Sequence, residues 1–490
     1  MQKSQIRGHH FLLPDLRLSA LALMFCLSLV ACSPAPNPPT STVNPKAAAT
    51  RTVAPTRSQV RATTIPAMPA GTSIPSAKLH GLKVHFWYAW SGNASATVEK
   101  LTSEFNATNS WGIWVTPTRF DSYADLFAAA APLFGKPTQP DVIIGSIEQA
   151  LLWNSEQDRV VDLTPFLQDP EYGMNSREIL DFPAGIWEGD AWNGLHLGIP
   201  AERSVRLMAY NQTWAKELGF SKPPTTLDEF ESQVCAAEKA VMKDGVSENN
   251  GMGGWLIDGD PDTAAAWALA FDAQLNPAKP GDPYKFHTPQ METAFQTLRR
   301  LFDKGCIWLG RNPDPSEYFL DRRALLITLQ SQDLPGLTAA LTNAGNQDVW
   351  TVLPFPTRDG KPAVMVNGPS YFLLRSEAEQ ELAAWLFIRW ISAPEQQARL
   401  AEAGSWAPLR KSTAASLKGF AAEHPQWKAA ADLTANARPS PAQASWRSAR
   451  LVLGDAFLQL FSADTQPNRI PYILDQLDAT IRELLEKGSS

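Results

Sequence analysis

The stretch that decides the fold is "GIPAERSVRLMAYNQTWAKELGFSKPPTTLDEF", residues 198–230. Its end, "PPTTLDEF", predicts the start of a helix: Thr226 is placed to cap the helix, and Glu229 three residues later can reach back to the cap. Before this stretch, strand-like runs such as "LKVHFWYAW" (82–90) and "PDVIIG" (140–145) alternate with helical segments. Strands separated by helices predict parallel pairing with helices on both faces, which is an α/β architecture.

The N-terminus is expected to carry an export signal. Lys3, Arg7 and Arg17 precede an apolar run from 18 to 31 that is short for a membrane span and typical of a signal-peptide core. The run ends in "LVAC" (29–32), which resembles the bacterial lipoprotein signal. That resemblance implies that residues 1–31 are removed and that Cys32 carries acyl chains that anchor the protein to a membrane. A plain secretory signal with an incidental cysteine is the alternative.

Residues 32–78 are expected to form a spacer. The segment 33–78 holds nine prolines among Thr, Ala and Ser, and it cannot bury enough apolar surface to fold. The whole chain has a net charge of -7, and its folded part has no basic run. Nucleic acid is therefore not expected as a partner, since phosphate binding needs clustered Lys and Arg.

Four cysteines are present. Cys26 leaves with the signal and Cys32 is the expected lipid site, so Cys235 and Cys306 remain in the folded part. Outside the cytoplasm a disulfide can persist, and we expect one between these two cysteines rather than two buried thiols.

Three segments in order resemble the bacterial extracellular solute-binding proteins of the sugar ABC-transporter class, the maltose-binding-protein-like group. Residues 198–230 follow that family's sequence of a small–Pro step, a strand, "YN", a short helix, "LG" and "PPxTWxEF", with Leu227 where Trp is usual. "DSYADLF…PDVIIG" (121–145) and "VNGPSYFLLRSEAEQ…GSWAPLRKS" (366–412) are similar to the family's earlier and later segments.

The resemblance implies two α/β lobes that clasp a ligand in a cleft. One lobe would comprise 79–200 plus 369–405 and the other 201–368 plus 406–490, with hinge crossings at 200–201, 368–369 and 405–406. It implies a monomer without cofactor, held outside the cytoplasm by its lipid, which delivers a mono- or oligosaccharide to an ABC permease. The class is not enzymatic.

A saccharide site needs flat aromatic side chains against the C–H face of each ring and carboxylates, amides and Arg around the hydroxyls. Trp90 ends the strand 82–90 beside Ser91, and Trp255 lies at an expected strand end, so both are stacking candidates; Asp258 or Asp260 is an expected hydroxyl acceptor. The complete set of expected ligand-binding residues is Trp90, Ser91, Asp121, Ser122, Glu202, Arg203, Trp255, Asp258, Asp260, Asn367, Gly368, Ser370, Tyr371, Trp406 and Trp446.

Other functions find less support. The alternating acids Asp258, Asp260 and Asp262 fail as an EF-hand loop, because Thr263 stands where Gly is needed and Leu269 where Glu is needed, so no metal site is expected. No P-loop, H-E-x-x-H or G-x-S-x-G motif occurs. A lipid-anchored carbohydrate-active enzyme, or the same fold with a non-sugar solute such as a polyamine, a phosphate ester or a metal chelate, remains the alternative.

Overall fold

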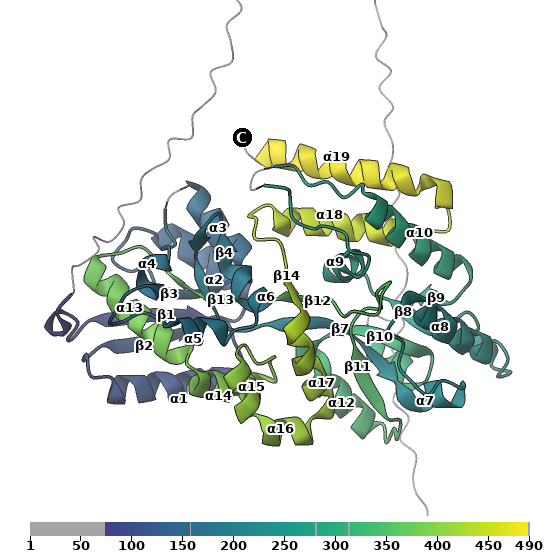
Figure 1. Ribbon diagram of the computed structural model, residues 1–490, viewed down its shortest axis with the longest axis horizontal. Coiled ribbons are helices and arrows are strands. Elements are labelled where there is room, and N and C mark those ends of the chain that lie inside the picture. Colours follow the sequence, from purple (N-terminus) through teal and green to yellow (C-terminus); the bar gives the residue numbers. More distant parts are fainter. Residues whose placement is uncertain (1–73, 157, 280–281, 312–313, 489–490) are drawn as a thin grey trace, which may run out of the picture. The chain divides into compact units, whose positions relative to one another are not determined.

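The computed structural model describes residues 74–490 except 157, 280–281, 312–313 and 489–490 (Figure 1). The predicted signal peptide, the lipid site at Cys32 and all of the spacer up to residue 73 lie outside the described residues. Within the described part, no helix combines the length and the apolar character needed to cross a bilayer.

The first sheet has the strand order β2-β1-β3-β13-β6. Its strands are β1 (Lys83–Tyr88), β2 (Trp114–Arg119), β3 (Val142–Gly145), β6 (Gly198–Pro200) and β13 (Ser370–Leu373). β1 pairs in parallel with β2 and β3, as the strand–helix alternation predicts, whereas β13 is antiparallel to β3 and β6. The purely parallel expectation is therefore wrong at this edge, because β13 enters from the second sheet instead of from a local strand–helix–strand unit.

The second sheet has the order β14-β12-β7-β10-β8-β9, and β11 also pairs with β7. Its strands are β7 (Ser204–Asn211), β8 (Gly253–Ile257), β9 (Ile307–Leu309), β10 (Ala324–Gln330), β11 (Trp350–Leu353), β12 (Val364–Asn367) and β14 (Ala437–Pro439). All eight residues of β7 are buried. A small hairpin, β4 (Ala191–Trp192) with β5 (Leu195–His196), completes the strands of the described chain.

The chain passes between the two sheets three times. It leaves the first sheet between β6 and β7, returns between β12 and β13, and reaches the second sheet again at β14. The backbone N–H groups of Ala201 and Glu202 both donate to the Pro369 carbonyl at 3.1 Å, so the first two passages are bonded to each other. These passages fall where the sequence places its first two hinge crossings.

Helices cover the first sheet and connect it to the second. They are α1 (Gly92–Thr108), α2 (Tyr123–Ala130), α3 (Ile147–Glu156), α4 (Thr164–Leu167), α5 (Ser176–Leu180), α6 (Ala184–Trp187), α13 (Ala378–Ile391), α14 (Pro394–Gly404), α15 (Lys411–Ser416), α16 (Lys418–Glu423) and α17 (Pro425–Leu433). Just before α13, the Ser376 N–H donates to Glu381. Glu379 pairs with Lys78.

The helices around the second sheet are α7 (Gln212–Glu217), α8 (Leu227–Val241), α9 (Pro261–Ala270), α10 (Pro289–Asp303), α11 (Pro315–Leu320), α12 (Leu334–Asn343), α18 (Trp446–Gln459) and α19 (Ile470–Gly488). The predicted capping box of α8 is confirmed: Thr226 accepts from the Glu229 N–H, and Glu229 accepts from the Thr226 N–H. The Glu229 carboxylate also accepts from the Thr225 N–H, and this bond, together with those from the Thr226 N–H and the Thr225 hydroxyl, lowers the pKa of Glu229 to about 2. α18 packs against α9 and α19, and the long α19 also contacts α10 (Figure 1).

A disulfide joins Cys235 of α8 to Cys306, which directly precedes β9. The two cysteines are 71 residues apart in sequence. The bridge ties a covering helix to an edge strand of the second sheet.

Candidate ligand pocket

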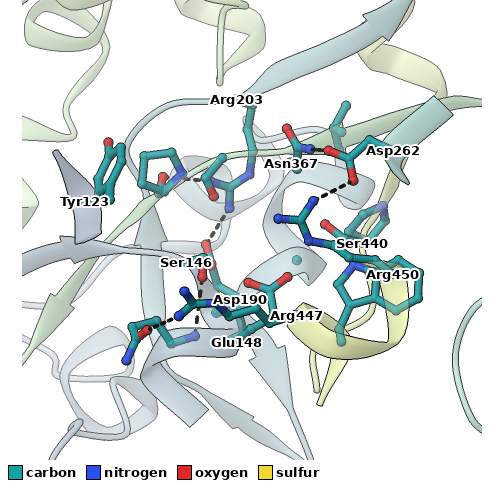
Figure 2. Close-up of a pocket in the computed structure, with 18 of the residues that line it drawn as sticks. Tyr123, Ser146, Glu148, Asp190, Arg203, Asp262, Asn367, Ser440, Arg447 and Arg450 are labelled. Carbon is teal, nitrogen blue, oxygen red and sulfur yellow. Dashed lines mark hydrogen bonds and ion pairs between the residues drawn. The ribbon is translucent and has the colours of Figure 1, made fainter. Parts of the chain in front are cut away.

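A cavity of about 380 Å³ is lined by residues that belong to both sheets and their connections. Figure 2 shows Tyr123 at one end of this pocket and Arg450 of α18 at the other. The lining residues are Tyr123, Ala124, Phe127, Ser146, Ile147, Glu148, Gln149, Gly189, Asp190, Arg203, Asp262, Val366, Asn367, Gly368, Pro369, Pro439, Ser440, Trp446, Arg447 and Arg450. Four of the residues expected from the sequence, Arg203, Asn367, Gly368 and Trp446, are among them.

The first turn of α3 forms one wall. β3 is a short, fully buried strand, and the chain turns at Ser146 directly into α3. Ser146 Oγ accepts from the Gln149 N–H at 3.3 Å, so the helix start is held by its own serine. Burial raises the pKa of the Glu148 carboxyl, which sequence reasoning did not single out.

The first turn of α18 forms the opposite wall. Trp446 is 1% exposed and its ring packs near Tyr284 at 6.0 Å between centroids. Arg447 Nη1 donates to Gln149 Oε1 at 3.5 Å, a long contact that links α18 to α3 (Figure 2). Among the described residues Arg447 has no carboxylate within ion-pair distance. It is thus a cationic group that an anionic or hydroxylated solute could engage.

Asp262 is the acid that α9 contributes to the pocket. It accepts from Asn367 Nδ2 at 2.5 Å and lies 3.5 Å from Arg450 Nη1. Burial raises its pKa, and Arg450 opposes that shift. A carboxylate held by an amide and a guanidinium keeps a fixed orientation, which suits it to accept a hydrogen bond from a solute hydroxyl.

The expectation for Asp258 and Asp260 is corrected by the geometry. Both carboxylates bind Arg206 of β7: Asp258 through Nη2, and Asp260 at 3.5 Å from Nη1. Asp260 also caps α9 by accepting from the Asp262 N–H at 2.8 Å. Neither residue lines the pocket, because the 5%-exposed Arg206 side chain requires these carboxylates as partners.

Arg203 lines the pocket, but its guanidinium group already makes hydrogen bonds to other residues of the protein. It donates to Asp190 Oδ2 at 2.8 Å, to Ser370 Oγ at 3.1 Å and to the carbonyls of Glu202, Gly368 and Pro369. Asp190 and Arg203 are 2% and 4% exposed at their side chains. Ser370, expected to touch ligand, instead donates to Asp190 and is fully buried. The pair holds the β6–β7 and β12–β13 passages together.

Gly368 is required by its surroundings. Its φ is 147°, and a Cβ there would lie 2.4 Å from the Glu202 carbonyl oxygen. Only glycine allows the two passages to approach this closely.

Four other expected residues form one buried cluster beside the pocket. Trp90 Nε1 donates to Glu202 Oε2 at 2.7 Å, and the Trp90 ring packs on Trp406 at 4.8 Å and on Tyr371 at 6.2 Å. Burial raises the pKa of Glu202 to about 7. The cluster adjoins the pocket at Tyr123, whose buried hydroxyl faces Glu202, so these residues support the wall without lining the cavity.

The remaining expected residues lie elsewhere. Trp255 is 0% exposed in the core of the second sheet, where its Nε1 donates to Thr328 Oγ1 at 3.0 Å and its ring packs against Trp267. The structure gives it a core role in place of the expected stacking role, because α9 covers the end of β8. Ser91 precedes α1, Ser122 caps α2, and exposed Asp121 pairs with Arg119.

No group of three or more His, Cys, Asp or Glu able to hold a metal ion occurs among the residues that the structure describes.

The fold and the pocket define a solute-binding class of protein. The chain belongs to the bacterial extracellular solute-binding proteins, whose family model matches residues 100–435. It is 22% identical over 334 residues to the sn-glycerol-3-phosphate-binding periplasmic protein UgpB of Rhizobium meliloti strain 1021. The aligned region covers 67% of this chain and 75% of that protein.

Solved structures of binding proteins share the fold. They include the sugar-binding protein MalE of Xanthomonas citri (TM-score 0.69, 20% identity, 83% of this chain and 98% of that chain). The cyclic alpha-maltosyl-1,6-maltose binding protein of Arthrobacter globiformis has a TM-score of 0.68, 17% identity, and coverage of 82% and 98%. UgpB of Mycobacterium tuberculosis in complex with glycerophosphocholine has a TM-score of 0.62, 16% identity, and coverage of 83% and 99%. The predicted two-lobe α/β fold and family are thereby confirmed.

Proposed function

We propose that this protein captures a small saccharide in the pocket between its two sheets and hands it, unaltered, to an ABC permease. The observation that carries the proposal is the oriented Asp262 carboxylate in a cavity that the half-buried aromatic side chains of Tyr123 and Phe127 also line. An aromatic ring can cover the C–H face of a sugar ring, and a fixed carboxylate accepts from its hydroxyls. Glu148 and Asn367 add further hydroxyl partners.

The size of the pocket favours a short solute. At about 380 Å³ it is near the lower end of small-molecule sites, which span roughly 300–1,000 Å³. Its aromatic lining residues are Tyr123, Phe127 and Trp446. A cavity of this size fits one or two sugar rings better than a long chain.

A phosphate ester of a small polyol is the second candidate. Arg447 lies in the first turn of α18, where the helix dipole also favours an anion, and Arg450 follows in the second turn. The Rhizobium relative is named for binding sn-glycerol 3-phosphate. Asp190 and Asp262 would not oppose an anion strongly, because each has a guanidinium partner.

Calorimetric titration with glucose, maltose and sn-glycerol 3-phosphate separates the candidates. We expect a sugar to bind and Asp262→Asn to weaken it about 10- to 100-fold, since a hydrogen bond to a charged group contributes about 1.5–3 kcal/mol. Asp121→Asn, an exposed acid outside the pocket, is the matched control and should leave affinity within about twofold.

Two results would change the conclusion. Binding of the phosphate ester alone, weakened at least about tenfold by Arg447→Gln, replaces the sugar with the second candidate. Turnover of any sugar contradicts a binding protein and supports the enzyme alternative.

We further propose that the chain moves as two lobes, residues 79–200 plus 369–405 and residues 201–368 plus 406–490. The three passages between the sheets support this division.

We also propose that acyl chains on Cys32 hold a monomer outside the cytoplasm. The "LVAC" motif supports this anchor. Expressed in a bacterium, the native chain should partition into the detergent phase of a detergent–water extraction, and Cys32→Ser should move it to the aqueous phase. If the native chain and Cys32→Ser partition equally between the two phases, the protein has no lipid anchor at Cys32.

A further inference from the structure

Glu202 lies where the three passages between the sheets meet. It follows β6 and is 8% exposed, and its neighbour Arg203 binds the carbonyls of Gly368 and Pro369 in the second passage. Its carboxylate accepts from Trp90 of the β1–α1 connection. The Trp90 ring in turn packs on Trp406, which follows α14 at the expected third crossing.

Few charges compensate this carboxylate. Arg203 is the nearest cation, and its guanidinium is already shared among Asp190, Ser370 and three carbonyls. The hydroxyls of Tyr123 and Tyr371 face Glu202, and both are buried without a hydrogen-bond partner among the described residues. His196, whose pKa burial lowers, lies near Asp190 and Arg203.

We propose that Glu202 makes solute capture sensitive to pH, because one buried carboxyl at the hinge must be dehydrated for the two sheets to line a single pocket. This inference rests on the proposed capture between two lobes, and it concerns the regulation of that same site. It assigns Glu202 a positioning role through Trp90 and the hinge, without contact to the solute.

The sign follows from the environment of the carboxyl. Burial raises the pKa of Glu202 to about 7 in the described conformation, whereas opening of the hinge to water would return it toward its ordinary value. A proton therefore binds the buried form more tightly, and lowering the pH through 7 favours that form. Since the buried form is the one with a pocket lined from both sheets, capture should strengthen as the pH falls.

Small-angle scattering of the solute-free protein between about pH 5.5 and about pH 8.5 tests the inference without a known ligand. The wild type should be most compact at low pH, expand in one transition as the pH rises, and change little further above about pH 7. Glu202→Gln, which keeps the shape and the acceptor for Trp90 but cannot ionise, should remain compact throughout. His196→Gln should keep the transition, since the assigned group is Glu202.

A second readout uses the solute that the calorimetric panel identifies. For the wild type, affinity should fall about tenfold between about pH 6 and about pH 8, and for Glu202→Gln by less than about twofold. A flat scattering profile in the wild type, or the same transition in Glu202→Gln, overturns the inference. If none of the panel solutes binds, the proposed function fails, while the scattering transition still decides the role of Glu202.

Discussion

Replacing Arg203 with Met is expected to lower the free energy of unfolding by about 3–5 kcal/mol, the largest loss for a single substitution in this account. The reason is the carboxylate that remains: Asp190 is 1% exposed and, among the residues that the structure describes, would keep only Ser370 as a side-chain donor. A buried carboxylate without its cation is costly because neither water nor another charge replaces the lost partner. Urea unfolding followed by circular dichroism gives the measurement.

Arg206→Met is the matched control. Arg206 is as buried as Arg203, but its partners Asp258 and Asp260 are 31% and 37% exposed at their side chains, so water can hydrate them after the substitution. We expect it to cost clearly less than Arg203→Met. The double variant Asp190→Leu/Arg203→Met should recover most of the loss, since it removes the stranded charge. Equal costs for the two arginines would contradict a special role for the hinge ion pair.

Removing the disulfide is expected to have the second-largest effect. The variant Cys235→Ser/Cys306→Ser should lose about 4 kcal/mol, because closure of a 71-residue loop restricts the unfolded chain. The same urea experiment measures it, and alkylation followed by mass spectrometry of the exported native protein shows whether the bridge is formed. The bridge does not stabilise this fold if both cysteines of the native protein are alkylated. The same conclusion follows if the double variant has the same urea midpoint of unfolding as the wild type.

Local patterns predicted the scaffold well. The strand at 82–90, the buried strand at 140–145 and the capping box at Thr226 are all read from neighbouring residues, and the structure contains β1, β3 and α8 there. Each of these features depends on contacts that the local sequence specifies. Gly368 was expected to contact the ligand; it lines the pocket, and the close approach that requires glycine there is to the Glu202 carbonyl, 166 residues away in sequence.

The pocket was predicted less completely because it is built from distant segments. Arg447 meets Gln149 across 298 residues of sequence, and no local pattern specifies that contact. Asp258 or Asp260 was expected to accept from a solute hydroxyl, but both bind Arg206 of β7, and Asp262, which was not singled out for this role, lines the pocket instead. Trp255 shows the opposite error: a tryptophan at a strand end becomes core when a helix covers it.

The central claim is that a solute is held intact between the two sheets. Native mass spectrometry of the protein incubated with a pool of mono- and disaccharides tests it most directly, followed by release and weighing of the bound molecule. We predict a single adduct per chain whose released mass equals that of one sugar in the pool, and its loss in Asp262→Asn. No adduct, or a released mass that matches a cleaved or modified sugar, would contradict the account.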